Sequence, residues 1–342
     1  MVESIDIEEF IERSKIIPIV DVRSPGEYQQ GHISGAINLP LFSDEERKEV
    51  GIRYKQSGKD FALLLGLDIT GPKLSAYARL IKKIAKDKEV LIHCWRGGKR
   101  SESMAWLSDF CGIKSSVLLN GYKSYRKYIR KDFEKTARIM ILGGMTGSGK
   151  SDILHQMKSD NQQVLDLEEI ANHKGSAFGF IGQEKQPTNE QFENDIFNCW
   201  NKFDFSKTIW IEDESQSIGY VQIPKPLYHK MRGANVIKIE KNKKFRAKRL
   251  VLEYSDCNID LLESAINKIS KRLGGLRTKQ CFQALKEKDF EKVALISLDY
   301  YDKAYNYGLS KRDQKTIHNL LLEVDDNEKN ANEIIKYYQK HF

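Results

Sequence analysis

The stretch that decides the fold is Glu89-Val90-Leu91-Ile92-His93-Cys94-Trp95-Arg96-Gly97-Gly98-Lys99-Arg100-Ser101. Its first five residues form a short apolar run bounded by charge, which is typical of a buried parallel strand. Ser101 opens a segment with helical character over residues 102–107. We therefore predict a strand, a tight loop and a helix, with Cys94 where the strand ends.

Cys94 is a candidate reactive residue because Arg96, Lys99 and Arg100 follow it closely. These charges and the free N–H groups of a helix start favour the thiolate over the thiol. Such surroundings lower a cysteine pKa from about 8.5 to roughly 3.5–7.5. Gly97 and Gly98 allow the backbone to turn its N–H groups toward an anion. The alternative is an inert cysteine packed at a strand end, which the three cations disfavour.

Composition and length limit the class of protein. The chain has 342 residues, 40% of them hydrophobic, which is enough for two domains. Its net charge of +8 is compatible with a polyanionic partner. The five cysteines include no Cys-x-x-Cys pair, so the sequence predicts neither a disulfide framework nor a zinc site. We expect a cytoplasmic protein without a membrane partner, since no apolar run approaches the roughly 20 residues that span a bilayer.

A second signature precedes the cysteine loop. It begins with Asp21-Val22-Arg23 and ends with Gly31-His32-Ile33-Ser34-Gly35-Ala36-Ile37-Asn38-Leu39-Pro40. Strands are expected over residues 16–22 and 36–39, and alternation with helices indicates a parallel α/β sheet. Together the two signatures resemble the rhodanese family of sulfur-transfer proteins. That resemblance implies that Asp21 and Arg23 are structural and that Cys94 carries a transferable chalcogen.

The same loop also resembles the signature loop of cysteine-dependent tyrosine phosphatases. In that family the cysteine attacks phosphorus and an arginine at the position of Arg100 clamps the phosphate oxygens. The loop is one residue longer between Cys94 and Arg100 than in ordinary rhodaneses, so it could hold a larger anion such as selenophosphate or a phosphate ester. A cysteine-dependent phosphatase fused to a nucleotide-binding module is therefore the alternative function.

Residues 122–131 combine tyrosines with lysines and arginines. This composition suits RNA phosphates and stacked bases. It is equally typical of an amphipathic helix whose tyrosines pack on the domain. The sequence does not decide between the two.

A phosphate-binding motif opens the second half of the chain. The apolar run 138–142 leads into Gly143-Gly144-Met145-Thr146-Gly147-Ser148-Gly149-Lys150-Ser151, and a helical segment follows. The strand, loop and helix context identifies a P-loop, whose N–H groups and lysine hold phosphates. The residues expected to bind a phosphate or diphosphate are Gly144, Thr146, Gly147, Ser148, Gly149, Lys150 and Ser151.

A second strand is predicted over residues 208–211, ending in Glu212-Asp213-Glu214-Ser215. Asp213 or Glu212 could hold Mg²⁺ through water, or these carboxylates could pair with lysines. From Pro226 onward the chain is expected to be helical and basic. Arg246 and Arg249 lie one helical turn apart and could reach a diphosphate or an RNA backbone.

Four peptides, residues 94–98, 143–150, 172–179 and 212–215, resemble the bacterial tRNA 2-selenouridine synthase family, and the resemblance covers essentially the whole chain. It implies an α/β fold, with a rhodanese-like parallel-sheet domain over residues 1–132. A P-loop α/β domain with a helical C-terminal region would occupy residues 133–342. The chain departs from the family at Lys174, where arginine is expected, and at residues 216–217, where basic residues are expected.

The resemblance also implies a reaction. The enzyme would convert the wobble 2-thiouridine of tRNA to 2-selenouridine, first by S-geranylation with geranyl diphosphate and then by selenation from selenophosphate. Cys94 would carry selenium, with Arg96, Lys99 and Arg100 stabilising its anion, and the P-loop would hold the diphosphate, with Mg²⁺ as an optional ion and no dedicated metal site. A selenophosphate-supplying enzyme could be a partner. A third hypothesis is an RNA-binding protein in which Cys94 has no role.

Overall fold

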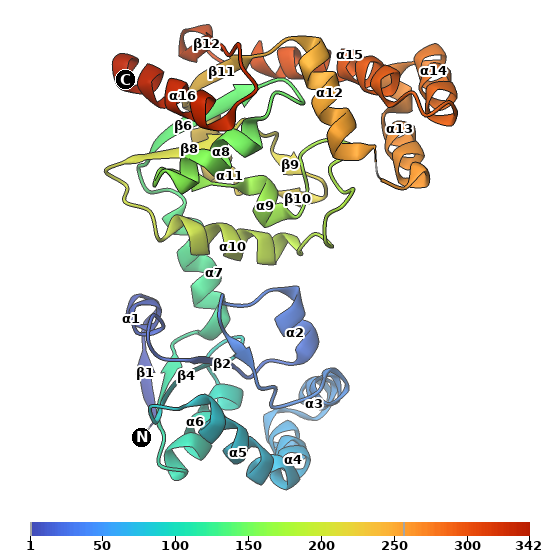
Figure 1. Ribbon diagram of the computed structural model, residues 1–342. Coiled ribbons are helices and arrows are strands. Elements are labelled where there is room, and N and C mark those ends of the chain that lie inside the picture. The colour runs from blue at the N-terminus through green and yellow to red at the C-terminus, as the bar shows by residue number, and fades with distance from the viewer. Residues whose placement is uncertain (1, 256) are drawn as a thin grey trace. The chain divides into compact units, whose positions relative to one another are not determined.

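The computed structural model describes residues 2–255 and 257–342. The chain divides into two compact units, Met1–Asp132 and Phe133–Phe342 (Figure 1). Each unit is built on a five-stranded sheet in which all paired strands are parallel. The parallel α/β class expected from the sequence is confirmed.

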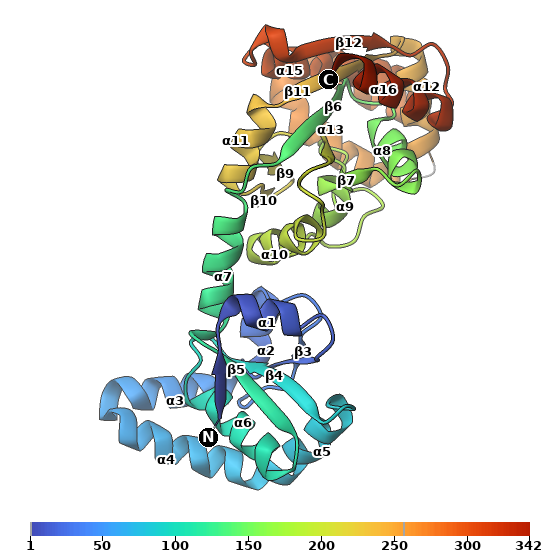
Figure 2. The same cartoon turned by 90° about the vertical axis from the view of Figure 1, so that its left-hand side faces the viewer.

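The first unit has the strand order β1-β5-β4-β2-β3. Buried aliphatic residues such as Val20, Val90 and Ile92 form its core with Ile81 and Met104 from the helices. Helix α5 packs with α6, and α1 packs with α7 (Figure 2). The strands are β1 (Glu3–Ile5), β2 (Ile19–Asp21), β3 (Ile37–Asn38), β4 (Glu89–His93) and β5 (Lys114–Leu118). The helices are α1 (Ile7–Arg13), α2 (Pro25–Gln30), α3 (Asp44–Ser57), α4 (Lys59–Thr70), α5 (Leu74–Ile84), α6 (Lys99–Phe110) and α7 (Gly121–Asp132), with a 3₁₀ turn at Gly71–Lys73.

The strand predicted over residues 16–22 is shorter than expected. Pro18 has no N–H to donate to a ladder, and Ile16 is 85% exposed. The pairing therefore begins at Ile19. By contrast, β4 occupies the five predicted residues Glu89–His93, because it lies in the centre of the sheet with strands on both sides.

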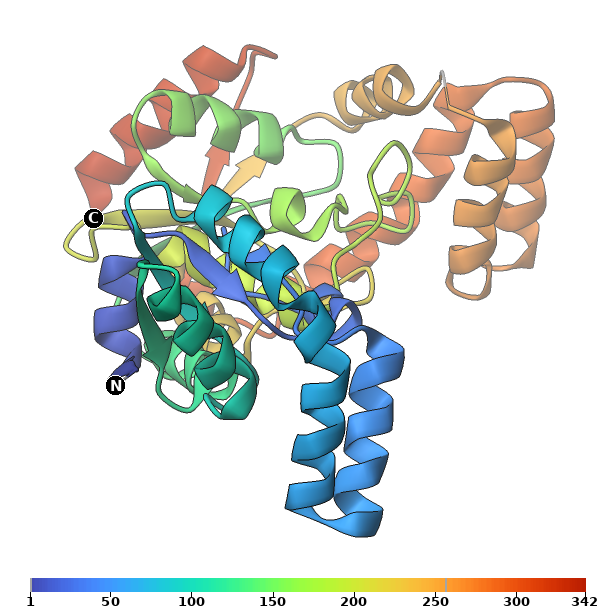
Figure 3. The ribbon, with the colours of Figure 1, turned by 90° about the horizontal axis from the view of Figure 1, so that it is seen from below.

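Helices α3 and α4 form a hairpin beside the sheet of the first unit (Figure 3). Ser43 and Glu46 close a reciprocal capping box at the start of α3, with Glu46 Oε2 accepting the Ser43 N–H at 2.8 Å. The apolar residues of α4 are largely uncovered, since Phe61, Leu64 and Leu67 are each more than half exposed. The apolar run of α4 is thus not part of the core.

Helix α7 carries the tyrosine-rich basic segment. Tyr122, Tyr125 and Ile129 are buried, whereas Lys123 and Lys127 are exposed. The tyrosines lie on one face of the helix and pack inside the protein. The structure therefore favours the amphipathic-helix interpretation over base stacking by these two buried rings.

The second unit has the strand order β12-β11-β6-β8-β7, with a small antiparallel pair β9–β10 outside that sheet. Helices α8 and α16 pack together over a cluster that includes Leu142, Trp210 and Ile237. The strands are β6 (Arg138–Gly144), β7 (Gln163–Leu165), β8 (Thr208–Glu212), β9 (Ser217–Ile218), β10 (Val221–Gln222), β11 (Asn235–Glu240) and β12 (Ile317–Leu321). The helices are α8 (Lys150–Ser159), α9 (Leu167–Ala171), α10 (Asn189–Trp200), α11 (Lys225–Gly233), α12 (Lys243–Tyr254), α13 (Ile259–Leu273), α14 (Gly275–Lys286), α15 (Phe290–Leu309) and α16 (Asn327–His341), with a 3₁₀ turn at Gln314–Thr316.

The C-terminal part is helical except for two strands that the sequence analysis missed. Strands β11 and β12 pair in parallel and extend the P-loop sheet beyond β6. Helices α12 to α15 form a helical region with its own core around Leu262, Ile266 and Leu285. Within the residues that the structure describes, no helix is both long and apolar enough to cross a bilayer.

Candidate active sites

The first site is the loop between β4 and α6. Cys94 follows the last residue of β4, and α6 begins at Lys99, so the thiol lies at the carboxyl end of a central parallel strand. Cys94 Sγ is 3.3 Å from Ser101 Oγ and accepts the Gly98 N–H at 3.4 Å. The residue is only 3% exposed and also touches the hydrophobic core.

The surroundings of Cys94 stabilise its thiolate. Burial opposes ionisation, but the Ser101 hydroxyl, the charge of Arg100 and the backbone N–H groups of Gly98 and Arg96 outweigh it and lower the pKa of Cys94. This is the direction expected from the cations and the helix start. An inert packed cysteine would instead have a raised pKa, as burial gives to Cys281.

The three candidate cations occupy different places. Arg100 lies beside the thiolate and is held by Glu27, whose Oε2 accepts from Nη1 at 2.6 Å. Arg96 has an exposed side chain and contributes its backbone N–H. Lys99 points to solvent and pairs with Glu102 at 2.8 Å. The bond to Glu27 thus fixes the guanidinium of Arg100 beside the thiolate.

Two glycines fix the shape of this loop. Gly97 has φ +65°, and a Cβ there would lie 2.6 Å from the Leu118 carbonyl oxygen. Gly121 has φ +55°, and its Cβ would lie 2.4 Å from the Cys94 carbonyl oxygen. The Tyr122 N–H donates to that same oxygen at 2.8 Å. The cysteine loop is therefore joined tightly to the start of α7.

Asp21 and Arg23 form a buried ion pair next to the start of α7. Both are fully buried, and Arg23 Nη2 lies 2.6 Å from Asp21 Oδ2. The Arg23 guanidinium also donates to the Gly31 carbonyl oxygen and lies 3.9 Å from the centre of the Tyr122 ring. The Asp21–Arg23 pair holds the segment that begins at Asp21 against the start of α7. This is the structural role that the rhodanese resemblance implies for the pair.

The second site is the P-loop between β6 and α8. Gly149 adopts a left-handed conformation just before the helix, as the motif predicts. Lys150 Nζ donates to the Gly144 carbonyl oxygen at 2.9 Å and lies 3.3 Å from Glu212 Oε1. Burial opposes the charge of Lys150, but Glu212 and neighbouring carboxylates outweigh it and raise its pKa. The lysine is thus held charged at the loop.

The remaining P-loop candidates are also placed. Gly144, Thr146 and Gly147 line a cavity together with Gly149, Lys150 and Ser151. Ser148 does not line it and is buried, with an Oγ that has no hydrogen-bond partner in the described part of the chain. The Thr146 carbonyl oxygen accepts from Arg246, which is buried and paired with Asp302 at 2.7 Å. Arg249 lines the cavity and pairs with Asp152 and Asp325.

Glu212 and Asp213, the two carboxylates that the sequence offered for a metal ion at the P-loop, have different partners. Ser151 Oγ lies 3.0 Å from Glu212 Oε2, so Glu212 is the strand-end carboxylate that meets the P-loop. The candidate Asp213 instead faces Arg312, whose Nη2 lies 2.5 Å from Oδ1. Successive residues of an extended chain point in opposite directions, which explains why the two neighbours diverge. Asp213 thus lines the cavity, but its carboxylate is held in an ion pair with Arg312.

Three carboxylates gather around Ser151. Oxygens of Glu168, Glu212 and Glu214 lie within 4.8 Å of one another. Burial and repulsion by Glu212 raise the pKa of Glu168 to about 10 and that of Glu214 to about 8. Such an oxygen cluster next to a P-loop serine fits a hard divalent cation. The sequence pointed to Glu212 here, but not to Glu168 or Glu214 as its partners.

A cavity of about 1250 Å³ joins this polar loop to an apolar wall. One end holds the P-loop and the carboxylates. The apolar wall comes from α12, α13 and α15 and from the 172–179 peptide, and it includes Phe178, Leu250, Tyr254, Leu262, Phe290, Val293, Ala294 and Leu309. A single ligand with a phosphate head and a hydrocarbon tail matches both ends.

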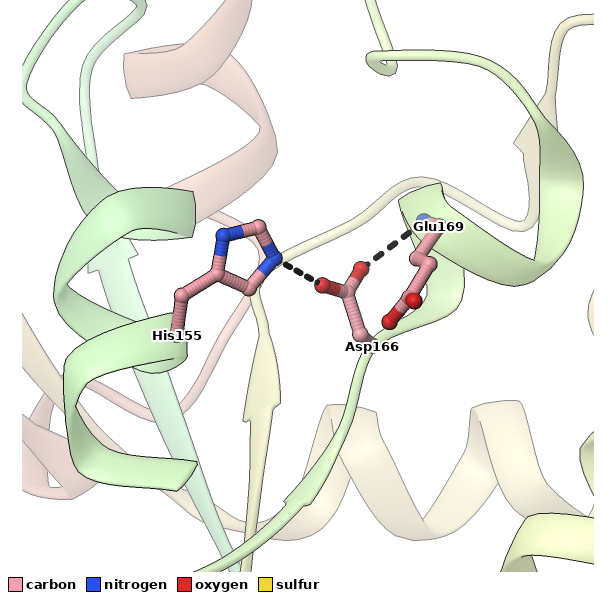
Figure 4. Close-up of side chains that lie close together, drawn as sticks. All are labelled: His155, Asp166 and Glu169. Atoms are coloured by element: carbon pink, nitrogen blue, oxygen red, sulfur yellow. Dashed lines mark hydrogen bonds and ion pairs between the residues drawn. The ribbon is translucent and has the colours of Figure 1, made fainter. Parts of the chain in front are cut away.

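A further polar trio, His155, Asp166 and Glu169, lies at the rim (Figure 4). His155 Nε2 is 2.7 Å from Asp166 Oδ2, and Asp166 Oδ1 accepts the Glu169 N–H at 2.8 Å as the N-cap of α9. Both oxygens of Asp166 are therefore bonded within the protein. We assign the trio to holding α9 against α8.

Position 174 and positions 216–217, where this chain departs from the family, contribute little positive charge to the site. Lys174 pairs with Glu253 and lies 5.8 Å from the centre of the Tyr254 ring. Ser217 is an edge residue of the β9–β10 pair. Lys174 is thus already neutralised in the structure.

Comparison with known proteins gives matches over most of the chain. Residues 137–340 match the family model of the tRNA 2-selenouridine synthase AAA domain, and residues 6–128 match the rhodanese-like domain. A Shewanella denitrificans protein named tRNA 2-selenouridine synthase is 32% identical over 88% of this chain and 90% of its own length. A Hydrogenovibrio crunogenus protein of the same name is 33% identical over 88% of this chain and 91% of its own. A solved rhodanese-related protein from Thermoplasma volcanium is 19% identical, covers 37% of this chain and 92% of its own, and has a TM-score of 0.24.

Proposed function

This chain belongs to the tRNA 2-selenouridine synthase family and is an enzyme of tRNA modification, and we propose that it exchanges the sulfur of wobble 2-thiouridine for selenium in two steps. The first step attaches a geranyl group from geranyl diphosphate to the sulfur. The second replaces the S-geranyl group with selenium from selenophosphate. We assign the first step to the unit Phe133–Phe342 and the second to the unit Met1–Asp132.

The observation that carries the first step is the two-ended cavity of the second unit. Geranyl diphosphate has a diphosphate for Lys150 and the P-loop N–H groups and an apolar tail for the wall near Phe178 and Leu262. In the reaction the carbon–oxygen bond of the donor breaks, a carbon–sulfur bond forms and the base loses its N3 proton. Diphosphate leaves with the bonding electrons, so fixed positive charge at the P-loop stabilises the transition state.

The carboxylate cluster supports a metal ion beside this leaving group. Glu168, Glu212, Glu214 and the Ser151 hydroxyl would hold Mg²⁺, which would supply further neutralisation of the diphosphate. Without a cation, burial and the charge of Glu212 raise the pKa values of Glu168 and Glu214 to about 10 and about 8, which favours their protonated forms at neutral pH.

The observation that supports the second step is the anion-stabilising loop around Cys94. We assign Cys94 to carrying the selenium on its way to the nucleoside. Ser101, Arg100 and the N–H groups of Gly98 and Arg96 stabilise negative charge on its sulfur, and the same groups suit a selenium anion bound there. At the nucleoside the selenium of selenophosphate held beside Cys94 attacks C2, so that a carbon–selenium bond forms, the carbon–sulfur bond breaks and the geranyl thiol leaves. Water then cleaves the selenium–phosphorus bond and releases phosphate.

The test is mass spectrometry of nucleosides after incubating 2-thiouridine tRNA with the enzyme, geranyl diphosphate and selenophosphate. The wild-type enzyme should yield 2-selenouridine. Cys94→Ala should stop at the S-geranyl nucleoside, and Lys150→Ala should leave 2-thiouridine unchanged. Normal geranylation by Lys150→Ala would refute the assignment of the P-loop, and normal selenation by Cys94→Ala would refute the role of the cysteine.

These incubations, together with a parallel assay on an aryl phosphate, separate the alternative functions. A cysteine-dependent phosphatase would hydrolyse an aryl phosphate in a reaction that Cys94→Ser abolishes. An RNA-binding protein without catalysis would leave the nucleosides unchanged with every variant. Selenation of wild-type samples together with absent aryl phosphate hydrolysis supports the proposed transferase.

A further inference from the structure

A second cavity of about 680 Å³ lies next to the donor cavity of the second unit. The two share lining residues, namely Gly175, Ser176 and Gln183. Its volume is in the range of roughly 300–1,000 Å³ that holds small ligands. The 172–179 peptide therefore forms a wall with one cavity on each side.

The side chains of this second cavity include exposed aromatic and cationic groups. Tyr220 is 64% exposed, and its hydroxyl donates to the Gln186 carbonyl oxygen at 3.0 Å, which holds the ring in place. Lys268 Nζ lies 3.7 Å from the centre of the Phe180 ring. The full lining is Asn172, His173, Gly175, Ser176, Ala177, Phe180, Gln183, Glu184, Lys185, Gln186, Ser217, Gly219, Tyr220 and Lys268.

Polar groups remain for a ligand. Asn172 donates to the Lys185 carbonyl oxygen through its amide nitrogen, which leaves its side-chain oxygen as an acceptor. His173 also lines the cavity, but its Nδ1 is buried against Gly179 and is not open to a ligand. Gln186, by contrast, is fully used, since its amide bonds Ala171, Ile218 and Tyr220.

This combination matches a nucleotide of single-stranded RNA. Bases stack on aromatic rings, their edges pair with amide groups, and lysines neutralise the flanking phosphates. The cavity offers Lys185 and Lys268 against the single carboxylate Glu184. An enzyme that acts on a base atom also needs that base turned out of its stack into a pocket.

We propose that the second cavity receives the target nucleotide of the tRNA and presents its base to the donor cavity at the residues that line both, Gly175, Ser176 and Gln183. This inference rests on the proposed function, because it names the site of the acceptor in the geranyl transfer. The acceptor sulfur and the donor carbon have to meet at about 3–3.5 Å, and cavities that share a border allow this.

The first test compares Tyr220→Ala with Tyr220→Phe. Loss of a stacking ring should raise the KM for tRNA about 5- to 150-fold, while the KM for geranyl diphosphate stays unchanged. Tyr220→Phe keeps the ring and should retain most of the affinity. Phe245→Ala is the matched control, since Phe245 is 53% exposed and lines neither cavity.

The second test measures charge. Lys268→Ala should reduce the slope of log affinity for tRNA against log salt by about one. Lys336→Ala removes an exposed lysine of α16 outside both cavities and should leave the slope unchanged. Equal slopes for Lys268→Ala and the wild type would count against a phosphate contact in this cavity.

The deciding experiment locates the base directly. An anticodon stem-loop with 5-iodouridine at the target position is bound to the full chain, irradiated, and the crosslinked peptide identified by mass spectrometry. Crosslinking within residues 172–186 or at Tyr220 supports the inference, and crosslinking elsewhere, or none, overturns it. If wild-type enzyme fails to geranylate 2-thiouridine, the proposed function falls; if it geranylates and Tyr220→Ala has an unchanged KM, this inference alone falls.

Discussion

Replacing Ser101 by alanine should raise the pKa of Cys94. Ser101 Oγ lies 3.3 Å from the sulfur and is, after the opposing effect of burial, the largest influence on this pKa. Alanine removes the hydroxyl without adding bulk. The backbone N–H of Gly98 and the charge of Arg100 remain in place.

The size of the shift follows from the hydrogen bond that is lost. A hydrogen bond to a charged group contributes about 1.5–3 kcal/mol, and one pKa unit corresponds to about 1.4 kcal/mol. Sulfur is a weak acceptor, and the same hydroxyl also reaches the Gly98 carbonyl oxygen at 3.0 Å, so the lower end applies. We expect the pKa of Cys94 to rise by about one unit.

The assay is the ultraviolet absorbance of the thiolate as a function of pH. Subtracting the curve of Cys94→Ala removes the other four of the five cysteines. Ser103→Ala is the matched control, because Ser103 is on the same helix but its hydroxyl donates to the Lys99 carbonyl oxygen. An unchanged pKa in Ser101→Ala, or an equal shift in Ser103→Ala, would refute this account of the loop.

Three further predictions concern buried charges. Asp21→Asn should destabilise the first unit by about 3–5 kcal/mol in urea unfolding, because it leaves Arg23 buried without its charge partner. Burial raises the pKa of Glu27, but Arg100 outweighs it and lowers that pKa. The stability that ionised Glu27 gives to the fold should therefore be complete above its unfolded pKa of about 4.3 and lost as pH falls through the lower folded value. In Glu27→Gln the Tm should fall less steeply as the pH is lowered. Mg²⁺ binding at pH 7 should release protons, because Glu168 and Glu214 have pKa values raised to about 10 and about 8. Calorimetry in two buffers of different ionisation enthalpy measures that release, and equal heats would contradict it.

Local patterns in the sequence were enough to predict the strand, loop and helix elements that carry the two candidate sites. Strand β4 and the presence of a helix after the P-loop were predicted, because an apolar run and a glycine-rich motif can each be recognised without distant residues. Strands β11 and β12 were missed because their pairing joins Val236 to Ile317, far apart in the chain. The helical, basic composition between them hides that long-range contact.

In the candidate sites, too, residues within one peptide could be predicted from the sequence, whereas their distant partners could not. Cys94 and Arg100 are visible in one peptide, but Glu27, which holds Arg100, lies 73 residues earlier. Likewise the choice between Glu212 and Asp213 depends on which way a strand end turns, and a shift of one residue reverses it. Side-chain direction and distant partners require the fold.

The contact between the cysteine loop and Gly121 limits how the enzyme can adapt to its cargo. No side chain fits at either Gly97 or Gly121, and the Cys94 carbonyl is bonded to the first turn of α7. A change in the conformation of the loop therefore has to displace that turn as well. Helix α7 begins at Gly121, so its first turn and the cysteine loop can only move together.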